Sequence, residues 1–146
     1  MDNSYKWAGG GILSTTNDLI KFGNAMLYSY QNNNGIINQE TIEMMWTPVE
    51  NSRMPWDVDG SYGMGWGVVK EQSNFPHCNS RQFYASHTGG AIGASSVLLI
   101  LPRKKVSMDD PYKVQGVVVT IIVNMQSVGL NKTALEIAQL FEQTNV

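Results

Sequence analysis

The sequence predicts an α+β fold, in which an antiparallel sheet of about four strands has helices packed on it. Two stretches with apolar residues at helical spacing come first, four strand-like stretches follow, and one more helical stretch ends the chain. A doubly wound parallel sheet would instead alternate strands and helices. The 146 residues are enough for one domain with a buried core, or for a piece of a larger domain.

The two early helices each begin at a residue that can cap them. Thr15 and Asp18 have the spacing of a capping box, and apolar residues follow at helical intervals as far as Tyr30. Asn38 is the predicted cap of a shorter second helix. One side of that second helix carries its apolar residues, Ile42, Met45 and Trp46.

Four strand-like stretches follow, at residues 62–69, 82–88, 94–101 and 116–123. The last two are rich in β-branched and aliphatic residues, which suit a sheet. In the first stretch glycine alternates with larger residues, so a strand there would have one nearly bare face that a neighbour approaches closely. The larger residues of this stretch are Tyr62, Met64 and Trp66. They are predicted to pack in the core, and the alternative is that they form a strip in contact with a cofactor.

The last predicted element is a helix that follows Gly129. Asn131 is its predicted cap, because an asparagine side chain can accept a hydrogen bond from an N–H of the first turn. The buried side of this helix is predicted to consist of Ala134, Leu135, Ala138 and Phe141.

Composition and charge exclude several classes of function. Ten lysines and arginines against twelve acidic residues give a net charge of −2, and the only basic cluster runs from Arg103 to Lys105, so we expect no nucleic-acid partner. Neither a signal peptide nor a transit peptide is visible at the N-terminus. The apolar stretches are shorter than the about 20 residues of a membrane span, so we expect no transmembrane segment in this chain.

The segment most suggestive of chemistry is 86–93. It is predicted to end a strand and to turn through Gly89, Gly90 and Gly93. The imidazole of His87 could act as a base or a donor, and backbone N–H groups beside glycines could stabilise a developing oxyanion. The alternative interpretation is a plain hairpin, with glycines for tight turns and a histidine that bonds to the backbone.

No cofactor or metal site is indicated elsewhere. His77 lies beside Cys78, but two further zinc ligands at suitable spacing are missing. The run from Gly9 to Gly11 lacks the Gly-Lys-Ser or Gly-Lys-Thr of a phosphate loop and is predicted to be a structural turn. The triplet at 30–32 formally matches Tyr-x-Asn, but its place at a helix end before a polar loop favours coincidence. We therefore expect no cofactor and no metal.

Five segments keep the order and spacing of a known pattern. They are Ala-Gly-Gly-Gly-Ile-Leu-Ser-Thr-Thr-Asn-Asp-Leu at 8–19, Tyr-Gly-Met-Gly-Trp at 62–66, His-Thr-Gly-Gly and a later glycine within 87–93, Leu-Pro at 101–102, and a late strand that ends at Asn124. Together they resemble the C-terminal half of the serine β-lactamase-like superfamily, which contains class C β-lactamases, D-alanyl-D-alanine carboxypeptidases and related esterases. Residues 84–98 and 124–130 are similar in particular to mitochondrial members from animals. The resemblance implies the C-terminal portion of the β-lactamase/transpeptidase-like fold and a mitochondrial location.

Three motifs meet in the active site of that superfamily: Ser-x-x-Lys gives the nucleophile and a base, Tyr-x-Asn assists proton transfer, and Lys-Thr-Gly lines the opposite wall. The third motif is present here as His87-Thr88-Gly89, with histidine in the lysine position. The resemblance implies that His87 is catalytic, orienting or protonating groups near the nucleophile. It also implies substrate-binding roles for Thr88, Gly89 and Gly90, with Thr88 bonding a substrate carboxylate and the N–H of Gly90 forming half of an oxyanion hole. The resemblance further implies a peptide or ester substrate for the full protein, and the lower positive charge of histidine than of lysine at pH 7 argues against a β-lactam.

No serine of this chain is followed three residues later by lysine. By the resemblance, residues 1–146 are therefore expected to be a partial domain that lacks the nucleophile and forms no acyl-enzyme alone. We expect its partner to be the missing N-terminal region of the same fold, or a second copy of the chain. Until that region is present, one face of the sheet and the segment 9–11 are expected to be exposed.

A non-catalytic role is the alternative. Mitochondrial members of the superfamily are thought to form assemblies and to influence organelle organisation and lipid metabolism. The resemblance therefore also allows a scaffold or interaction module with those links. A Ser-x-x-Lys motif upstream in the parent gene would favour acyl transfer, and its absence there would favour the scaffold.

Overall fold

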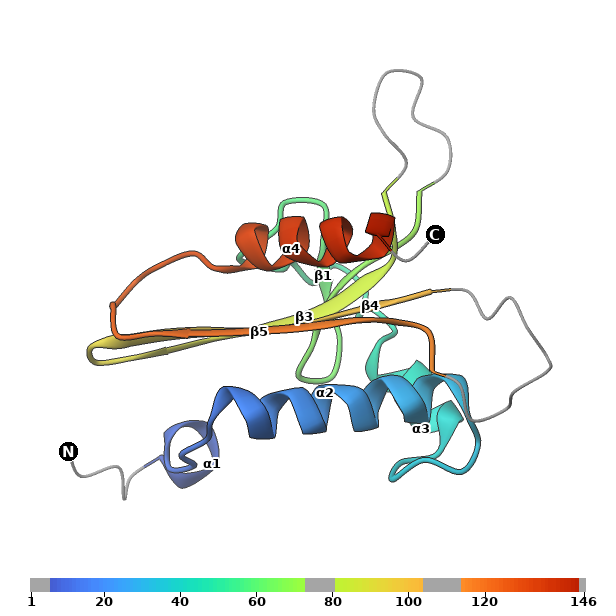
Figure 1. The fold of residues 1–146 in the computed structure, drawn as a ribbon, viewed down its shortest axis with the longest axis horizontal. Helices are drawn as coiled ribbons and strands as arrows, with labels where there is room; N and C mark the ends of the chain where they lie inside the picture. Colours follow the sequence, from blue (N-terminus) through green and yellow to red (C-terminus); the bar gives the residue numbers. More distant parts are fainter. Residues whose placement is uncertain (1–5, 73–80, 104–113, 145–146) are drawn as a thin grey trace.

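Within the residues that the structure describes, 6–72, 81–103 and 114–144, five strands form one antiparallel sheet with helices on both faces. This computed structural model confirms the predicted α+β class. Helix α4 lies on one face of the sheet, and α2 and α3 lie on the other (Figure 1). The elements are α1 (Trp7–Gly10), α2 (Thr16–Gln31), α3 (Gln39–Met45), β1 (Ser61–Tyr62), β2 (Gly67–Val69), β3 (Tyr84–Ala91), β4 (Ala94–Pro102), β5 (Gly116–Val123) and α4 (Asn131–Thr144).

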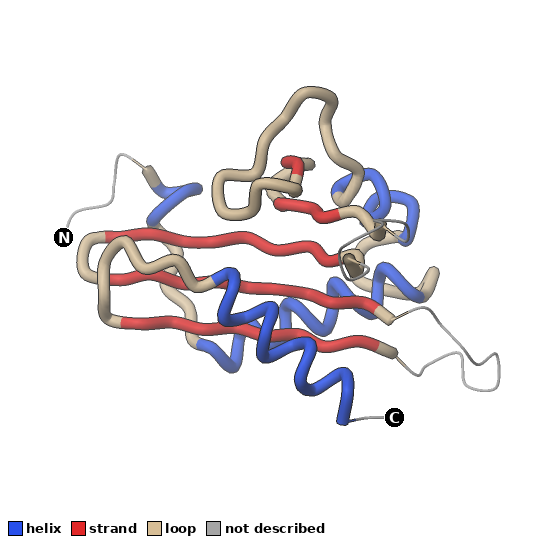
Figure 2. The backbone as a smooth tube through the Cα atoms, turned by 90° about the horizontal axis from the view of Figure 1, so that it is seen from above, coloured by secondary structure: helices blue, strands red, loops and turns tan. Residues whose placement is uncertain are grey.

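The strands follow one another across the sheet in chain order, β1-β2-β3-β4-β5, and neighbouring strands are antiparallel. Strands β3, β4 and β5 are long and lie side by side, whereas β2 covers only the first part of β3 (Figure 2). The turn Ile92-Gly93 joins β3 to β4, and the φ of +79° at Gly93 favours glycine. Gly89 and Gly90 lie within β3, because pairing with β4 keeps them extended, so the prediction that they also form the turn is wrong.

The stretch predicted as one strand at 62–69 forms two short strands joined by a tight turn. The N–H of Gly63 donates to the carbonyl of Trp66 at 2.7 Å, and Gly65 has a φ of +74°. Glycine has no Cβ to oppose this left-handed conformation, so the chain reverses where a continuous strand was expected. The described sheet therefore has a fifth strand beyond the prediction.

The predicted close approach to the glycines of this hairpin is confirmed at two positions. A Cβ on Gly63 would lie 2.5 Å from the carbonyl oxygen of Met45, and a Cβ on Gly67 would lie 2.5 Å from the sulfur of Met54. Of the three larger residues predicted to be core, only Trp66 is buried. The glycines thus let the hairpin lie directly against its neighbours.

Two apolar cores fill the space between the sheet and its helices. Residues of β4 alternate between them, so Leu99 packs with α4 whereas Leu98 packs with α2 and α3. Helix α2 approaches so closely that a Cβ on Gly23 would lie 2.5 Å from Val118 of β5. Helices of this chain thus cover most of both faces. The predicted exposure of a sheet face is therefore wrong for most of the sheet and holds only at the second half of β3, where His87 and residues 89–91 are exposed.

Two of the three predicted helix caps are confirmed. Thr15 accepts a hydrogen bond from the N–H of Asp18 at 3.2 Å, and Asn38 accepts one from the N–H of Thr41 at 2.8 Å. The third prediction is wrong, because Asn131 is the first residue of α4 rather than the residue before it. Its buried side chain instead donates to a residue of β3.

Apolar side chains are exposed near both ends of the chain. Gly9 is exposed, as predicted for the segment 9–11, whereas Gly10 and Gly11 are half-buried. Leu13, just after them, is 94% exposed. Phe141 was expected on the buried side of α4 but is 59% exposed, because Ala134 and Ala138 make the contact of α4 with the sheet.

A polar network ties the loop between α3 and β1 to the sheet. Tyr84 donates its hydroxyl to Asp57 at 2.6 Å and accepts a hydrogen bond from Asn131 at 3.1 Å. Arg81 pairs with Asp57 at 3.4 Å and also with Asp59. Burial alone would raise the pKa of the Asp57 carboxyl, but its hydrogen bonds and the charge of Arg81 outweigh burial and lower that pKa. The carboxylate therefore anchors this loop in its charged form.

We expect Gly63→Ala to destabilise the protein by about 1–3 kcal/mol, because the new methyl group would collide with the backbone carbonyl of Met45. Gly129→Ala is the matched control, since no heavy atom lies within 4 Å of the added Cβ there. The control should change the free energy of unfolding by less than about 0.5 kcal/mol. Urea unfolding followed by circular dichroism measures both variants, and equal stabilities would contradict the close packing of the hairpin.

We expect Asp57→Asn to lower the free energy of unfolding by about 1 kcal/mol at pH 7, because an amide accepts a weaker hydrogen bond than a carboxylate. The pKa of Asp57 is lowered in the folded protein. Its carboxylate therefore stabilises the fold above the unfolded pKa of about 3.9, and this contribution is lost as the pH falls through the lowered folded value.

The measurement is urea unfolding of the wild type and Asp57→Asn between about pH 7 and pH 2. The difference in stability should be largest above about pH 5 and should shrink as the pH falls below about 4. Glu50→Gln controls for the loss of one negative charge. A difference that stays constant down to the lowest pH would show that ionised Asp57 does not anchor the loop.

Candidate functional site

One edge of β3 is open over its second half. Strand β2 pairs with β3 only from Tyr84 to Ser86, and no other strand of the described chain pairs with the outer side of β3 from His87 to Ala91. We call residues 87–91 the open edge. It contains all the residues predicted to form the site: His87, Thr88, Gly89 and Gly90.

The register of the β3–β4 hairpin decides which backbone groups face outward. Residues that flank a two-residue turn form a hydrogen-bonded pair, and such pairs alternate with non-bonded pairs along antiparallel strands. Ala91 pairs with Ala94 beside the turn, so the N–H and C=O groups of Gly90 and Thr88 point away from β4. Ser86, the next residue in this series, is the one that faces β2. The open edge thus directs backbone donors and acceptors into the space beside the sheet.

His87 is the first residue beyond the part of β3 that β2 covers. Its Nε2 lies 2.7 Å from the hydroxyl oxygen of Tyr62. The rings of Trp56 and Tyr62 meet the imidazole edge to face, with centroids 5.3 and 6.0 Å from it. The residue is nevertheless exposed, so its imidazole is held by neighbours and stays accessible to a ligand.

Hydrogen bonds fix both of these neighbours of His87. Trp56 donates its indole N–H to the hydroxyl of Ser86 at 3.1 Å. The N–H of Tyr62 donates to the hydroxyl of Ser52 at 2.9 Å, and its carbonyl accepts from the N–H of Val49 at 2.9 Å. Two segments far apart in the sequence, 56–62 and the strand β3, therefore meet in one aromatic cluster, which consists of Trp56, Tyr62 and His87.

The remaining residues of the open edge differ in their surroundings. Side chains alternate along a strand, so Thr88 and His87 start from opposite faces of β3. A Cβ on Gly89 would lie 2.4 Å from the hydroxyl oxygen of Ser96, whereas a Cβ on Gly90 would have no heavy atom within 4 Å. The face of the strand at Gly90 is therefore open, beside the edge to which its N–H points. The structure brings the predicted residues to one edge, and their chemical roles stay predictions.

The Tyr-x-Asn triplet at 30–32 has structural partners away from the open edge. Tyr30 stacks on Phe83, with ring centroids 5.9 Å apart. The side chain of Gln31 is hydrogen-bonded to backbone groups of two segments, one just after β4 and one just before β5. Asn32 donates to a carbonyl in the last turn of α2. These contacts support the prediction that the match to Tyr-x-Asn is a coincidence.

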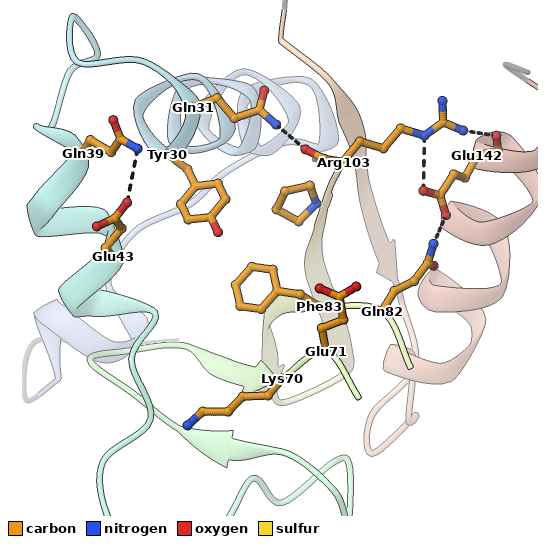
Figure 3. Close-up of a pocket in the computed structure, with 11 residues that line it drawn as sticks. Tyr30, Gln31, Gln39, Glu43, Lys70, Glu71, Gln82, Phe83, Arg103 and Glu142 are labelled. Atoms are coloured by element: carbon orange, nitrogen blue, oxygen red, sulfur yellow. Dashed lines mark hydrogen bonds and ion pairs between the residues drawn. The ribbon is translucent and has the colours of Figure 1, made fainter. Parts of the chain in front are cut away.

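A pocket of about 630 Å³ opens at the other end of β3, where that strand begins (Figure 3). Arg103 in its wall pairs with Glu142 of α4 at 3.2 Å, and Gln82 also donates to Glu142. Lys70 and Glu71 come from the segment after β2. No residue of the open edge lines this pocket, so it is separate from the predicted site.

Over residues 6–72, 81–103 and 114–144, no group of three or more His, Cys, Asp or Glu side chains is placed to hold a metal ion. His77 and Cys78 lie outside the described residues. In the same ranges no helix has both the length and the apolar character needed to cross a bilayer.

Sequence reasoning missed Trp56 and Tyr62 as neighbours of His87. Tyr62 and Met64 were both expected in the core, but Met64 is 54% exposed at the turn and Tyr62 contacts His87. One sequence signal could have pointed to Tyr62 as a site residue, because it lies in the segment 62–66, one of the five segments that carry the resemblance. Trp56 lies in an irregular loop without periodicity, so no sequence signal points to it.

Comparison with known proteins gives one family. The family model described as Beta-lactamase matches residues 1–140. The serine beta-lactamase-like protein LACTB, mitochondrial, of Mus musculus is 56% identical over 155 residues, which cover 98% of this chain and 28% of that protein. The proteins of the same name from Homo sapiens and Bos taurus are each 54% identical with the same coverage, so the chain spans 28% of the length of these relatives. Because the family model matches almost the whole chain, the chain belongs to the β-lactamase family, as the resemblance predicted.

Proposed function

We propose that this chain forms one wall of the active site of a serine hydrolase of peptidase or esterase type, which acts by acyl transfer. The observation that carries the proposal is the open edge of β3. An acyl group lying along that edge would meet the imidazole of His87 and the outward N–H of Gly90 together. Membership of the β-lactamase family supports the reaction class.

Each group on the edge has a chemical task in this proposal. The N–H of Gly90 donates to the oxyanion that develops on the substrate carbonyl, and a donor already in place stabilises the transition state without reorganisation. His87 orients or protonates the group that leaves. Thr88 bonds a substrate carboxylate through its hydroxyl, and Gly89 between Thr88 and Gly90 leaves room for Ser96 of β4, which a Cβ would meet at 2.4 Å.

The nucleophile has to come from outside this sequence, because no Ser-x-x-Lys motif occurs among its 146 residues. The named relatives are longer, and the chain spans 28% of their length. We therefore propose that the complete site is assembled from this wall and from another region of a longer, mitochondrial protein. A covalent mechanism needs both parts, since the wall alone offers only binding and an oxyanion donor.

We expect a protein extended upstream through the parent gene, so that it includes Ser-x-x-Lys, to be labelled at that serine by a fluorophosphonate probe. His87→Ala should slow labelling on the order of 100-fold, because a positioned acid or base contributes roughly 10²–10⁴-fold. The fluorescence of the labelled protein band as a function of time gives both rates.

Two controls accompany this measurement. The 146-residue chain alone should take up no stoichiometric serine label, and Gly129→Ala in the extended protein should be labelled at the parent rate. Stoichiometric serine labelling of the chain alone would overturn the requirement for a second region. Equal rates for the parent and His87→Ala would remove His87 from the mechanism.

A non-catalytic scaffold is the second candidate, and exposed apolar residues before α2 favour it. Trp7, Ile12 and Leu13 are 70%, 80% and 94% exposed, and α1 has no buried residue. Figures 1 and 2 both place α1 near the end of the sheet that carries the β3–β4 turn. Exposed apolar groups that gather in this way mark a surface for another protein region. The chain would then be an interaction module linked to mitochondrial organisation and lipid metabolism, as its resemblance to mitochondrial relatives allows.

We expect the purified chain to self-associate, because these apolar side chains gain free energy when a second copy covers them. The double variant Ile12→Ser, Leu13→Ser should shift the chain toward the monomer. Val58→Ser is the matched control, since Val58 is 98% exposed but lies in a different loop. Size-exclusion chromatography with light scattering at several concentrations measures the mass, and a wild type that stays monomeric throughout would contradict the scaffold surface.

A further inference from the structure

We infer that Tyr62 is a positioning residue for His87, which it holds in the tautomer that presents Nδ1–H to a bound ligand. The hydroxyl of Tyr62 lies 2.7 Å from Nε2 of His87. In the described part of the chain, this is the hydrogen bond that the imidazole makes. Nδ1 is therefore the nitrogen left to bond a ligand, and the inference rests on the proposed acyl-transfer site for the use of that nitrogen.

The direction of this hydrogen bond sets the chemistry of the ring. A phenol is a better donor than acceptor, because its ring draws electron density from the oxygen. When Tyr62 donates to Nε2, the proton of the neutral imidazole of His87 must be on Nδ1. The free nitrogen is then a hydrogen-bond donor and not an acceptor.

This polarity matches the position that His87 occupies in the motif. The resemblance places it where related proteins have lysine, whose ammonium group can only donate hydrogen bonds. A histidine free to choose its tautomer would offer a donor in one form and an acceptor in the other. With Tyr62 bonded to Nε2, His87 keeps the donor character of the lysine even when it is neutral.

Tyr62 can hold this position because its own backbone is fixed. Its N–H and C=O are bonded to Ser52 and Val49, and its ring packs edge to face on Trp56 with centroids 6.0 Å apart. Trp56 in turn is bonded to Ser86 on the same strand as His87. A side chain locked in this way directs its partner without losing conformational freedom when a ligand binds.

The test measures the tautomer of His87 directly in the 146-residue chain. The chain has two histidines, so His77→Ala leaves His87 as the only imidazole. Long-range proton–nitrogen NMR spectra of the ¹⁵N-labelled chain at mildly alkaline pH report which ring nitrogen carries the proton. We expect Nδ1–H to predominate in this parent and to become the minor form in Tyr62→Phe, because an unconstrained imidazole prefers Nε2–H.

The control is Tyr28→Phe, which removes a hydroxyl from α2 that takes no part in the contacts of His87. It should leave the tautomer unchanged, and the backbone amide spectrum checks that each variant is folded. The same tautomer ratio in the parent and Tyr62→Phe would overturn the inference. Should Tyr62→Phe fail to fold, the parent spectrum decides, since predominant Nε2–H there also overturns it. The readout needs no nucleophile, so it is independent of the outcome of probe labelling.

Discussion

The short length of β2 is the constraint on which the candidate site depends. If β2 continued back along β3 from Gly67, its backbone would cover the outward N–H groups of Thr88 and Gly90. The turn with Gly65 at a φ of +74° instead sends the chain away from β3 at that point. A bare strand edge is usually an aggregation hazard. Here it is only five residues long, 87–91, and glycines make part of it a weak template for further pairing.

The same turn also supplies the environment of the imidazole. By reversing the chain it creates β1, and Tyr62 of β1 then lies within hydrogen-bond distance of His87. The loop before β1 brings Trp56 against both Tyr62 and the imidazole, and the half-buried hydrogen bond between Asp57 and Tyr84 fixes that loop to β3. One hairpin and one anchored loop therefore both expose the edge and order the side chain at its start.

Local patterns in the sequence were enough for most of the fold, and contacts between distant segments account for the rest. Thr15 and Asn38 cap their helices as predicted, because capping depends on residues within one turn. Asn131 was misjudged, because its side chain bonds to Tyr84, far away in the sequence. The motif at His87 could be recognised from neighbouring residues alone. The contact of His87 with Tyr62 could not, because the two residues are 25 positions apart and meet through a turn that hydrophobic periodicity did not reveal.

The two candidate functions use different surfaces of the chain. These surfaces differ in how far contacts within the chain fix or cover their side chains. The geometry around His87 depends on contacts with Tyr62 and Trp56, all within this chain, so the wall is formed before any partner arrives. The segment with Ile12 and Leu13 has no comparable cover in the described structure. In the proposed assembly, a second region of a longer protein buries that segment and brings a nucleophile to an edge whose groups are already in place. Preorganisation of the wall and dependence on a partner are thus compatible, because they concern separate residues.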